Sequence, residues 1–197
     1  MTNWFTSDWH FGHEKMQQGL RGKAFTSPEN HDTALKENIF NTVKPGDNLY
    51  FLGDAFWKWD SKKVERFMTD LKKHKISLHW ILGNHDRLSW TRFSCVKWVG
   101  HIKDIVIEKQ PITLCHYPML TWNRSHYGAW NLHGHIHIDD STSKKLPIKM
   151  PLYPLGKQLN VNVEYHSYKP ISFEEVDLIM KGYEENWDYI KKEDRRR

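Results

Sequence analysis

The 197-residue sequence contains only two cysteines, Cys95 and Cys115, and no long hydrophobic run. Two cysteines in a chain of this length do not form the disulfide framework of a small secreted domain, so we expect free thiols and a cytoplasmic location. The longest apolar runs are no longer than a β-strand, which excludes a membrane-spanning helix. The N-terminus enters a predicted strand at once, without the basic and apolar segments of a secretory signal, so we expect no secretion.

Aromatic residues are abundant, at 14% of the chain with ten tryptophans. That composition excludes disorder over most of the length, and the size predicts one domain over residues 1–197. The formal net charge of +5 favours anionic substrates but does not establish nucleic-acid binding. Part of the excess lies in the tail 191–197, which we expect to be flexible. Two interpretations of this tail stay open: a solvated end, or an electrostatic contact with polyphosphate or nucleic acid.

The order of the predicted elements indicates an α/β fold of two packed mixed β-sheets flanked by helices. Apolar periodicity predicts helices that begin at Ser27-Pro28 and at Ser61, and a capping box at Ser172 opens a third. Residues 11–25 are expected to form a loop with a short helix, and residues 147–156 a turn-rich connection. The predicted strands cover residues 2–6, 48–52, 75–82, 102–108, 111–115, 130–132 and 159–164, and the fourth and fifth of these form a hairpin.

Five short polar motifs each follow an apolar, strand-like run. In open α/β sheets ligands gather beyond the carboxyl ends of the strands, so these distant positions can converge on one cavity. Their donors are nitrogen and oxygen, which suits divalent manganese, iron, nickel or zinc. Two such ions about 3.5–4 Å apart are a general device for attack on phosphorus. The motifs are Asp8-Trp9-His10, Gly53-Asp54, Gly83-Asn84-His85-Asp86, His116 and Gly134-His135-Ile136-His137.

This ordered series resembles the calcineurin-like metallophosphoesterases, with their pattern DxH, GD, GNHD, H and GHxH. The likeness covers residues 8–137, and weaker similarity over 160–176 extends it to nearly the whole chain. The stretches 7–13 and 131–135 look most like the small stand-alone phosphoesterases of bacteria and phages. The resemblance implies a four-layer sandwich with helices outside two central sheets, and an enzyme that hydrolyses phosphate esters.

The resemblance also implies roles for the motif residues around two divalent ions, for which manganese is our first expectation. Asp54 would bridge the ions, and a hydroxide between them would be the nucleophile. His85 would protonate the leaving oxygen or stabilise developing charge, and Asp86 would orient His85 or serve simply as a turn residue. One ion would be held by Asp8, His10, Asp54 and His137, and the other by Asp54, Asn84, His116 and His135.

Substrate contacts are predicted in the loop 122–128, which follows one ligand motif and precedes another. Trp122 would stack on a base while Arg124 pairs with phosphate; in the alternative, Trp122 packs the loop against the core. Arg87 is either an anion contact or an exposed structural arginine. His13 either touches substrate or stabilises its own loop by a hydrogen bond. Two further tryptophans, Trp57 and Trp59, would wall the pocket or cover the core.

We therefore expect a dinuclear metal-dependent phosphoesterase, most of all a phosphodiesterase that acts on nucleotide-type substrates. The alternatives are a phosphomonoesterase on small phosphorylated metabolites or nucleotides and, third, a nuclease on single strands. The Asp-Arg-Gly that follows Gly-Asp in protein phosphatases is absent after Gly53-Asp54, which disfavours phosphoprotein substrates. A catalytically silent binding scaffold is the rival from another class, and the intact ligand set counts against it.

Overall fold

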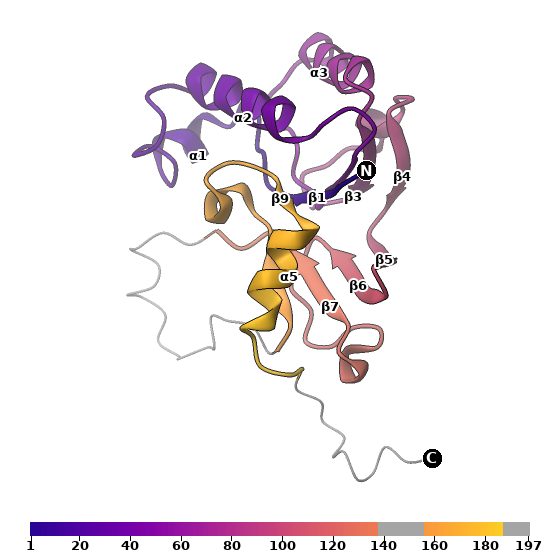
Figure 1. The fold of residues 1–197 in the computed structure, drawn as a ribbon. Helices are drawn as coiled ribbons and strands as arrows, with labels where there is room; N and C mark the ends of the chain where they lie inside the picture. The colour runs from indigo at the N-terminus through magenta and orange to yellow at the C-terminus, as the bar shows by residue number, and fades with distance from the viewer. Residues whose placement is uncertain (138–155, 187–197) are drawn as a thin grey trace.

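The first of two β-sheets contains four parallel strands and one short antiparallel strand at its edge. The computed structural model describes residues 1–137 and 156–186, and Figure 1 shows both sheets. In register, Phe5 lies beside Tyr50, and Tyr50 lies beside His79. The order across this sheet is β4 (Val96–Gly100), β3 (Ser77–Ile81), β2 (Asn48–Phe51), β1 (Asn3–Thr6) and β9 (Ile171–Ser172).

The second sheet is also mixed, and it begins with the predicted hairpin. Its first two strands are antiparallel, with Ile102 opposite Cys115 and Ile107 opposite Gln110, and the next two pairs are parallel. The order is β5 (Ile102–Ile107), β6 (Gln110–Cys115), β7 (Trp130–His133) and β8 (Gln158–Asn160).

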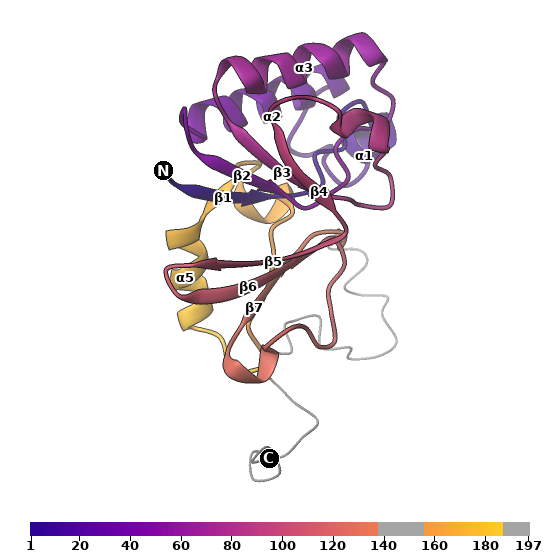
Figure 2. The same ribbon diagram turned by 90° about the vertical axis from the view of Figure 1, so that its right-hand side faces the viewer.

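Two hydrophobic cores hold the layers together. One core lies on the outer face of the first sheet, under α2 (Pro28–Thr42) and α3 (Ser61–Lys73). The other lies between the sheets and includes side chains of α5 (Phe173–Lys181), which closes the edge of the sandwich in Figure 2. These layers confirm the predicted fold class. The short elements are α1 (Glu14–Gln18) and the 3₁₀ turns η1 (Leu88–Thr91), η2 (Ser125–Tyr127) and η3 (Val163–His166).

The helix boundaries follow the predicted capping chemistry, with one correction. The Ser27 side chain accepts from the amide of Asn30, and the capping box at Ser172 is complete. Helix α3 was predicted to be capped by Ser61. It is capped by Asp60 instead, because the Asp60 carboxylate accepts from the amide of Lys63.

The prediction of a strand over residues 159–164 was right only for its beginning. β8 ends at Asn160, and the chain then turns into η3, because the Asn162 side chain accepts from the amide of Glu164. The strands β4 and β9 were not predicted. Most of the predicted connection 147–156 and all of the tail 191–197 lie outside the described residues.

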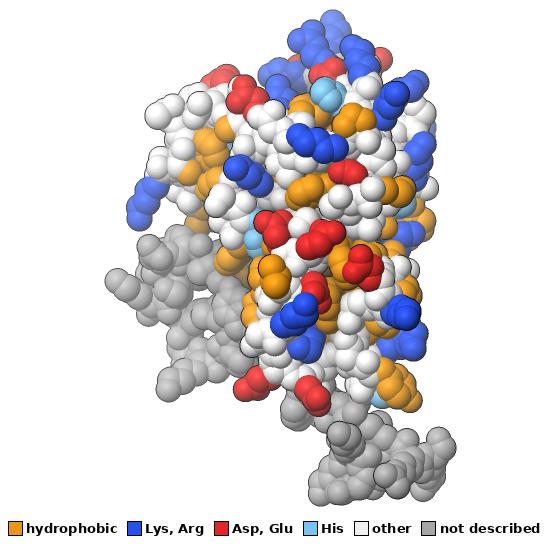
Figure 3. Space-filling model, in the orientation of Figure 1, with side chains coloured by type: hydrophobic (Ala, Val, Ile, Leu, Met, Phe, Trp, Pro, Cys, Tyr) orange, Lys and Arg blue, Asp and Glu red, His pale blue; other side chains and the backbone are white. Residues whose placement is uncertain are grey.

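Basic side chains gather over α3 on the face shown in Figure 3. Its first turns carry Lys62, Lys63 and Arg66, and its last turn carries Lys72 and Lys73. Over residues 1–137 and 156–186, no helix has both the length and the hydrophobicity that a bilayer crossing requires.

Candidate metal centre

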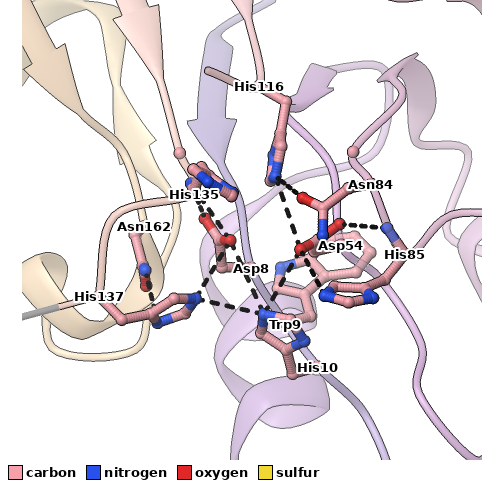
Figure 4. Close-up of polar contacts among 12 residues, drawn as sticks. Asp8, Trp9, His10, Asp54, Asn84, His85, His116, His135, His137 and Asn162 are labelled. Atoms are coloured by element: carbon pink, nitrogen blue, oxygen red, sulfur yellow. Dashed lines mark hydrogen bonds and ion pairs between the residues drawn. The ribbon is translucent and has the colours of Figure 1, made fainter. Parts of the chain in front are cut away.

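Neighbouring parallel strands carry the predicted ligands to one place. β1, β2 and β3 lie side by side, and beyond their carboxyl ends come Asp8, Asp54 and Asn84. The parallel strands β6 and β7 of the second sheet lead into His116 and His135 in the same way. Figure 4 shows these side chains converging from both sheets, so the site lies where the carboxyl ends of the two sheets meet.

Four of the seven predicted ligands have a left-handed backbone, which few residues other than glycine adopt. Their φ angles are +58° for Asp8, +48° for His10, +62° for Asp54 and +70° for His135. Backbone hydrogen bonds lock the first three into place: the Asp8 amide donates to Gly53, and the His10 amide donates to Asp54. Such outliers cluster at functional sites, where the surrounding structure holds them.

The first cluster joins Asp8, His10 and His137. The Nε2 atoms of His10 and His137 face each other at 3.3 Å. Asp8 Oδ1 lies 3.4 Å from Nε2 of His137 and 3.8 Å from Nε2 of His10. These three side chains therefore aim their donor atoms at a common point.

The second cluster surrounds Asp54. Its Oδ2 lies 3.5 Å from Nε2 of His116 and 3.7 Å from Nε2 of His10, so one carboxylate oxygen faces both halves of the site. Asn84 Oδ1 lies 3.1 Å from the same His116 nitrogen. His135 adds an imidazole whose ring centre is 5.1 Å from that of His116, and its backbone N–H donates to Asp8. Donor atoms of Asp8, Asp54 and His116 also lie within 4.8 Å of one another.

This donor set fits divalent metal ions. Two ligands that each lie about 2.1 Å from one ion are roughly 3–4 Å apart, which matches the separations within both clusters. Tautomers agree as well. His116 donates through Nδ1 to the Leu52 carbonyl at 2.7 Å, and His137 faces the Glu164 carboxylate through Nδ1 at 2.9 Å. Each ring therefore turns Nε2, the atom available to a metal, toward the centre.

The electrostatics of the first cluster favour positive charge. Burial opposes ionisation of Asp8, but the hydrogen bond from His137 and the nearby imidazoles lower its pKa to about 2. Burial likewise opposes protonation of His137, yet Asp8 and Glu164 raise its pKa to about 9. Burial lowers the pKa of His10 and raises that of Asp54. The pocket thus holds a carboxylate charge that a cation can compensate.

A buried network behind the first cluster was missed from the sequence. Arg21 is fully buried; its guanidinium donates to the carbonyls of Asp8 and Trp9, at 2.7 and 3.0 Å. The same guanidinium pairs with Glu164 at 2.8 Å, and Glu164 in turn contacts His137. Arg21 lies in the aperiodic segment 11–25 and Glu164 is 143 residues away, so no local pattern could have joined them.

Two glycines leave the space that the ligands occupy. A Cβ at Gly83 would collide with the Asp54 carboxylate, and a Cβ at Gly134 would collide with the Asp8 carboxylate. Glycine is therefore needed at both positions for the backbone to approach the ligand carboxylates this closely.

His85 lies at the edge of the metal centre, but Asp86 does not form the predicted hydrogen bond to it. The His85 side chain is 37% exposed, and its Nε2 lies 4.0 Å from Asp54, so it borders the centre. No hydrogen bond or ion pair joins the Asp86 carboxylate to that imidazole. Its carboxylate accepts from the amides of Asp54, Ala55 and Gly83 and from the Trp80 indole. The predicted orientation of His85 by Asp86 is thus corrected: Asp86 instead fixes the loop that carries Asp54.

The predicted substrate contacts divide between those near the centre and those away from it. His13 lies near: its ring is 5.5 Å from that of His10, and its Nδ1 accepts from the Met16 amide at 3.1 Å. The loop-stabilising interpretation of His13 therefore holds, and the residue also lies next to the site. The exposed Arg87 turns its guanidinium over Trp90, 5.4 Å from the ring centre, which fits the structural interpretation.

The loop 122–128 does not reach the metal centre, which corrects the predicted substrate contacts of Trp122 and Arg124 and leaves the alternative, that Trp122 packs the loop. β6 and β7 are parallel, so the chain must return to the opposite end of the sheet before β7 begins. Gln110, at the start of β6, donates to the Gly128 carbonyl there. Trp122 is 7% exposed and donates to the Ala129 carbonyl, so its indole packs the loop. Arg124 lines a hollow of about 160 Å³ over β5 and β6.

Fold and donor set together define a metal-dependent phosphoric ester hydrolase. A profile of the calcineurin-like phosphoesterases matches residues 1–196, and the chain belongs to that family. The family uses divalent metal ions, in agreement with the clusters around Asp8, His10, His137, Asp54 and His116.

Three proteins illustrate what this chain is similar to. An uncharacterized protein of Methanocaldococcus jannaschii is 29% identical over 89% of this chain and 87% of its own length. A solved structure of a protein of unknown function from Aquifex aeolicus superposes with a TM-score of 0.65 at 26% identity, covering 90% of this chain and 98% of the other. The UDP-2,3-diacylglucosamine hydrolase of Blochmanniella floridana is 26% identical over 66% of this chain and 58% of its own.

Proposed function

We propose that this chain is a dinuclear metal-dependent phosphodiesterase that acts on nucleotide-type substrates. The position of Asp54 carries the proposal, because its Oδ2 lies 3.7 Å from His10 in one cluster and 3.5 Å from His116 in the other. A carboxylate between two nitrogen-rich clusters is what two neighbouring ions require. When bound, the ions would polarise the phosphoryl group and make a nucleophile available near neutral pH.

The residues of this chain would divide the remaining work between them. Asp8, His10, Asp54 and His137 would hold one ion, and Asp54, Asn84, His116 and His135 the other, with manganese our first choice. His85 borders the centre with an exposed imidazole, while its backbone N–H donates to Asp54 at 3.0 Å. It is therefore placed to hold a proton for the leaving oxygen. Asp86 keeps Asp54 in its strained backbone conformation.

The cationic side chains support a diester over a monoester. A monoester carries one more negative charge at its phosphorus than a diester. Arg21, Arg87 and Arg124 do not supply a compensating charge. Arg21 is hydrogen-bonded to backbone carbonyls and to Glu164, and Arg87 lies over Trp90. Arg124 lies at the far end of the second sheet. A phosphomonoesterase thus stays the alternative. A nucleotide-type substrate is supported by the name of the Blochmanniella floridana relative, a hydrolase of a UDP-linked sugar.

Hydrolysis of paired aryl esters tests the proposal. After manganese loading, bis(4-nitrophenyl) phosphate should be hydrolysed with a higher kcat/KM than 4-nitrophenyl phosphate, and chelation should abolish both activities. Preference for the monoester would select the phosphomonoesterase. Two bound ions with no turnover of either ester would select the silent scaffold.

A further inference from the structure

An exposed tryptophan contacts two histidines that border the candidate metal ligands. Trp57 is 38% exposed, and among the tryptophans in residues 1–137 and 156–186 it alone belongs to the exposed large hydrophobic side chains. Its ring centre is 4.3 Å from that of His13 and 4.6 Å from that of His85. His85 in turn borders Asp54. The solvent-exposed indole therefore lies beside the candidate metal centre.

The backbone displays this ring in a fixed position. The Trp57 amide donates to the Phe11 carbonyl at 2.9 Å, in a short parallel bridge between Phe11 and Phe56. Phe56 is 1% exposed and points into the core, where it stacks on Phe11. Successive residues of an extended segment point to opposite sides, so Trp57 points outward. The core thus holds the indole at the rim of the site.

His13 supports the ring from one side. The two rings stack at an angle of 27°, and His13 is itself held because its Nδ1 accepts from the Met16 amide. His85 meets Trp57 in an edge contact at 73°. A rigid, partly exposed indole beside a phosphoryl-transfer centre has the properties of a stacking platform, since every nucleobase offers a π face.

We infer that Trp57 is the residue that recognises an aromatic group of the substrate, a nucleobase attached through its sugar to the ester being cleaved. The inference rests on the proposed function and deepens it. It moves recognition from the buried Trp122 to the loop that carries Asp54. Tyr117, 44% exposed and with its ring 4.7 Å from that of His135, borders the other half of the centre and is the rival platform.

Two diesters with the same leaving group make the test. Thymidine 5′-(4-nitrophenyl phosphate) and methyl 4-nitrophenyl phosphate differ only in the group that does not leave. Trp57→Ala should lower kcat/KM for the thymidine ester about 5–150-fold, the range expected for loss of one stacked base. The loss for the methyl ester should be at least about fivefold smaller. Trp57→Phe should recover part of the discrimination, because it keeps a ring of smaller area.

Two control variants locate the effect. Tyr127→Ala removes another exposed ring, one in the η2 turn at the far end of the sheet, and should leave both rates unchanged. If Tyr117→Ala, and not Trp57→Ala, lowers the thymidine rate selectively, the assignment to Trp57 is overturned. Equal losses for the two esters in Trp57→Ala would overturn it too, and would make Trp57 a support for His85.

A binding measurement separates this inference from the proposed function. Calorimetric titration of the manganese-loaded protein should show that Trp57→Ala weakens thymidine 5′-monophosphate about 5–150-fold but changes inorganic phosphate little. Manganese content and thermal unfolding of the variant establish that it is folded and loaded. No hydrolysis of either diester by the intact loaded protein would contradict the proposed function, whereas equal weakening of both ligands would contradict only the role of Trp57.

Discussion

The buried floor of the metal centre and its exposed rim are built in different ways. The floor consists of four side chains that are at most 3% exposed: Asp8, His10, Asp54 and His116. The rim consists of three solvent-exposed residues, Asn84, His85 and His135. The floor ligands are held by Arg21, Asp86 and the backbone of neighbouring strands. The floor residues are thus buried and fixed by the fold, whereas the rim combines two of the proposed ligands, Asn84 and His135, with the solvent-facing imidazole of His85.

Removal of the shared carboxylate should break this comparison most severely. Asp54→Ala takes a ligand from both clusters and leaves the opposing imidazoles without their common anion. We expect turnover to fall about 10⁴-fold or more, together with a loss of bound manganese by elemental analysis. Retention of both ions in this variant would show that Asp54 does not bridge them.

Removal of the rim imidazole should separate chemistry from metal binding. His85→Ala should keep both ions but lose on the order of 10²–10⁴ in turnover, as expected for a general acid. The loss should shrink for nitrophenolate, a leaving group that needs little protonation. Equal losses with good and poor leaving groups would indicate stabilisation of charge instead, and loss of metal would make His85 a ligand.

The network behind the floor should have a smaller, selective effect. Glu164→Gln removes the charge that His137 and Arg21 share, at 2.9 and 2.8 Å, and should weaken manganese binding about 10–100-fold. Calorimetry on the metal-free protein measures this without any turnover. Glu174→Gln, at an exposed position of α5, is the matched control, and an equal change in both variants would argue against a role for Glu164.

The smallest effect lies outside the site and concerns pH. Burial, with the charge of Lys103 adding to it, lowers the pKa of His79 to about 4 from 6.5. The unfolded chain therefore binds more protons between these values, so the contribution of His79 is complete above pH 6.5 and disappears toward pH 4.

His79→Phe keeps the ring that stacks on Tyr50 at 4.6 Å but removes the titration. Denaturant unfolding at pH 7 and pH 4.5 should show that the wild type loses about 1–2 kcal/mol more stability than the variant. The same pH dependence in both proteins would refute the contribution of His79.

The ligand motifs were predictable because each is local. An apolar strand followed by a polar turn can be recognised within a few residues of sequence. The same holds for the long helices and the β5–β6 hairpin. β9 has two residues and β4 follows a 3₁₀ turn closely, so neither offered a clear alternation. The extra turn after Asn160 depended on a single side-chain cap, which competes with strand propensity.

Predictions that depended on where a loop or a side chain points in the folded protein were less accurate. The loop 122–128 stands between two ligands in the sequence, but the parallel pairing of β6 and β7 sends it to the other end of the sheet. Asp86 follows His85 directly, yet its carboxylate turns toward Asp54. The pairing of Arg21 with Glu164 is set by tertiary packing alone.

The most direct test of the central claim is a manganese titration of the metal-free protein followed by low-temperature electron paramagnetic resonance. A floor with Asp54 facing both clusters predicts two bound equivalents and a spin-coupled signal from neighbouring ions. Saturation at one equivalent, or two uncoupled signals, would contradict the bridged dinuclear centre.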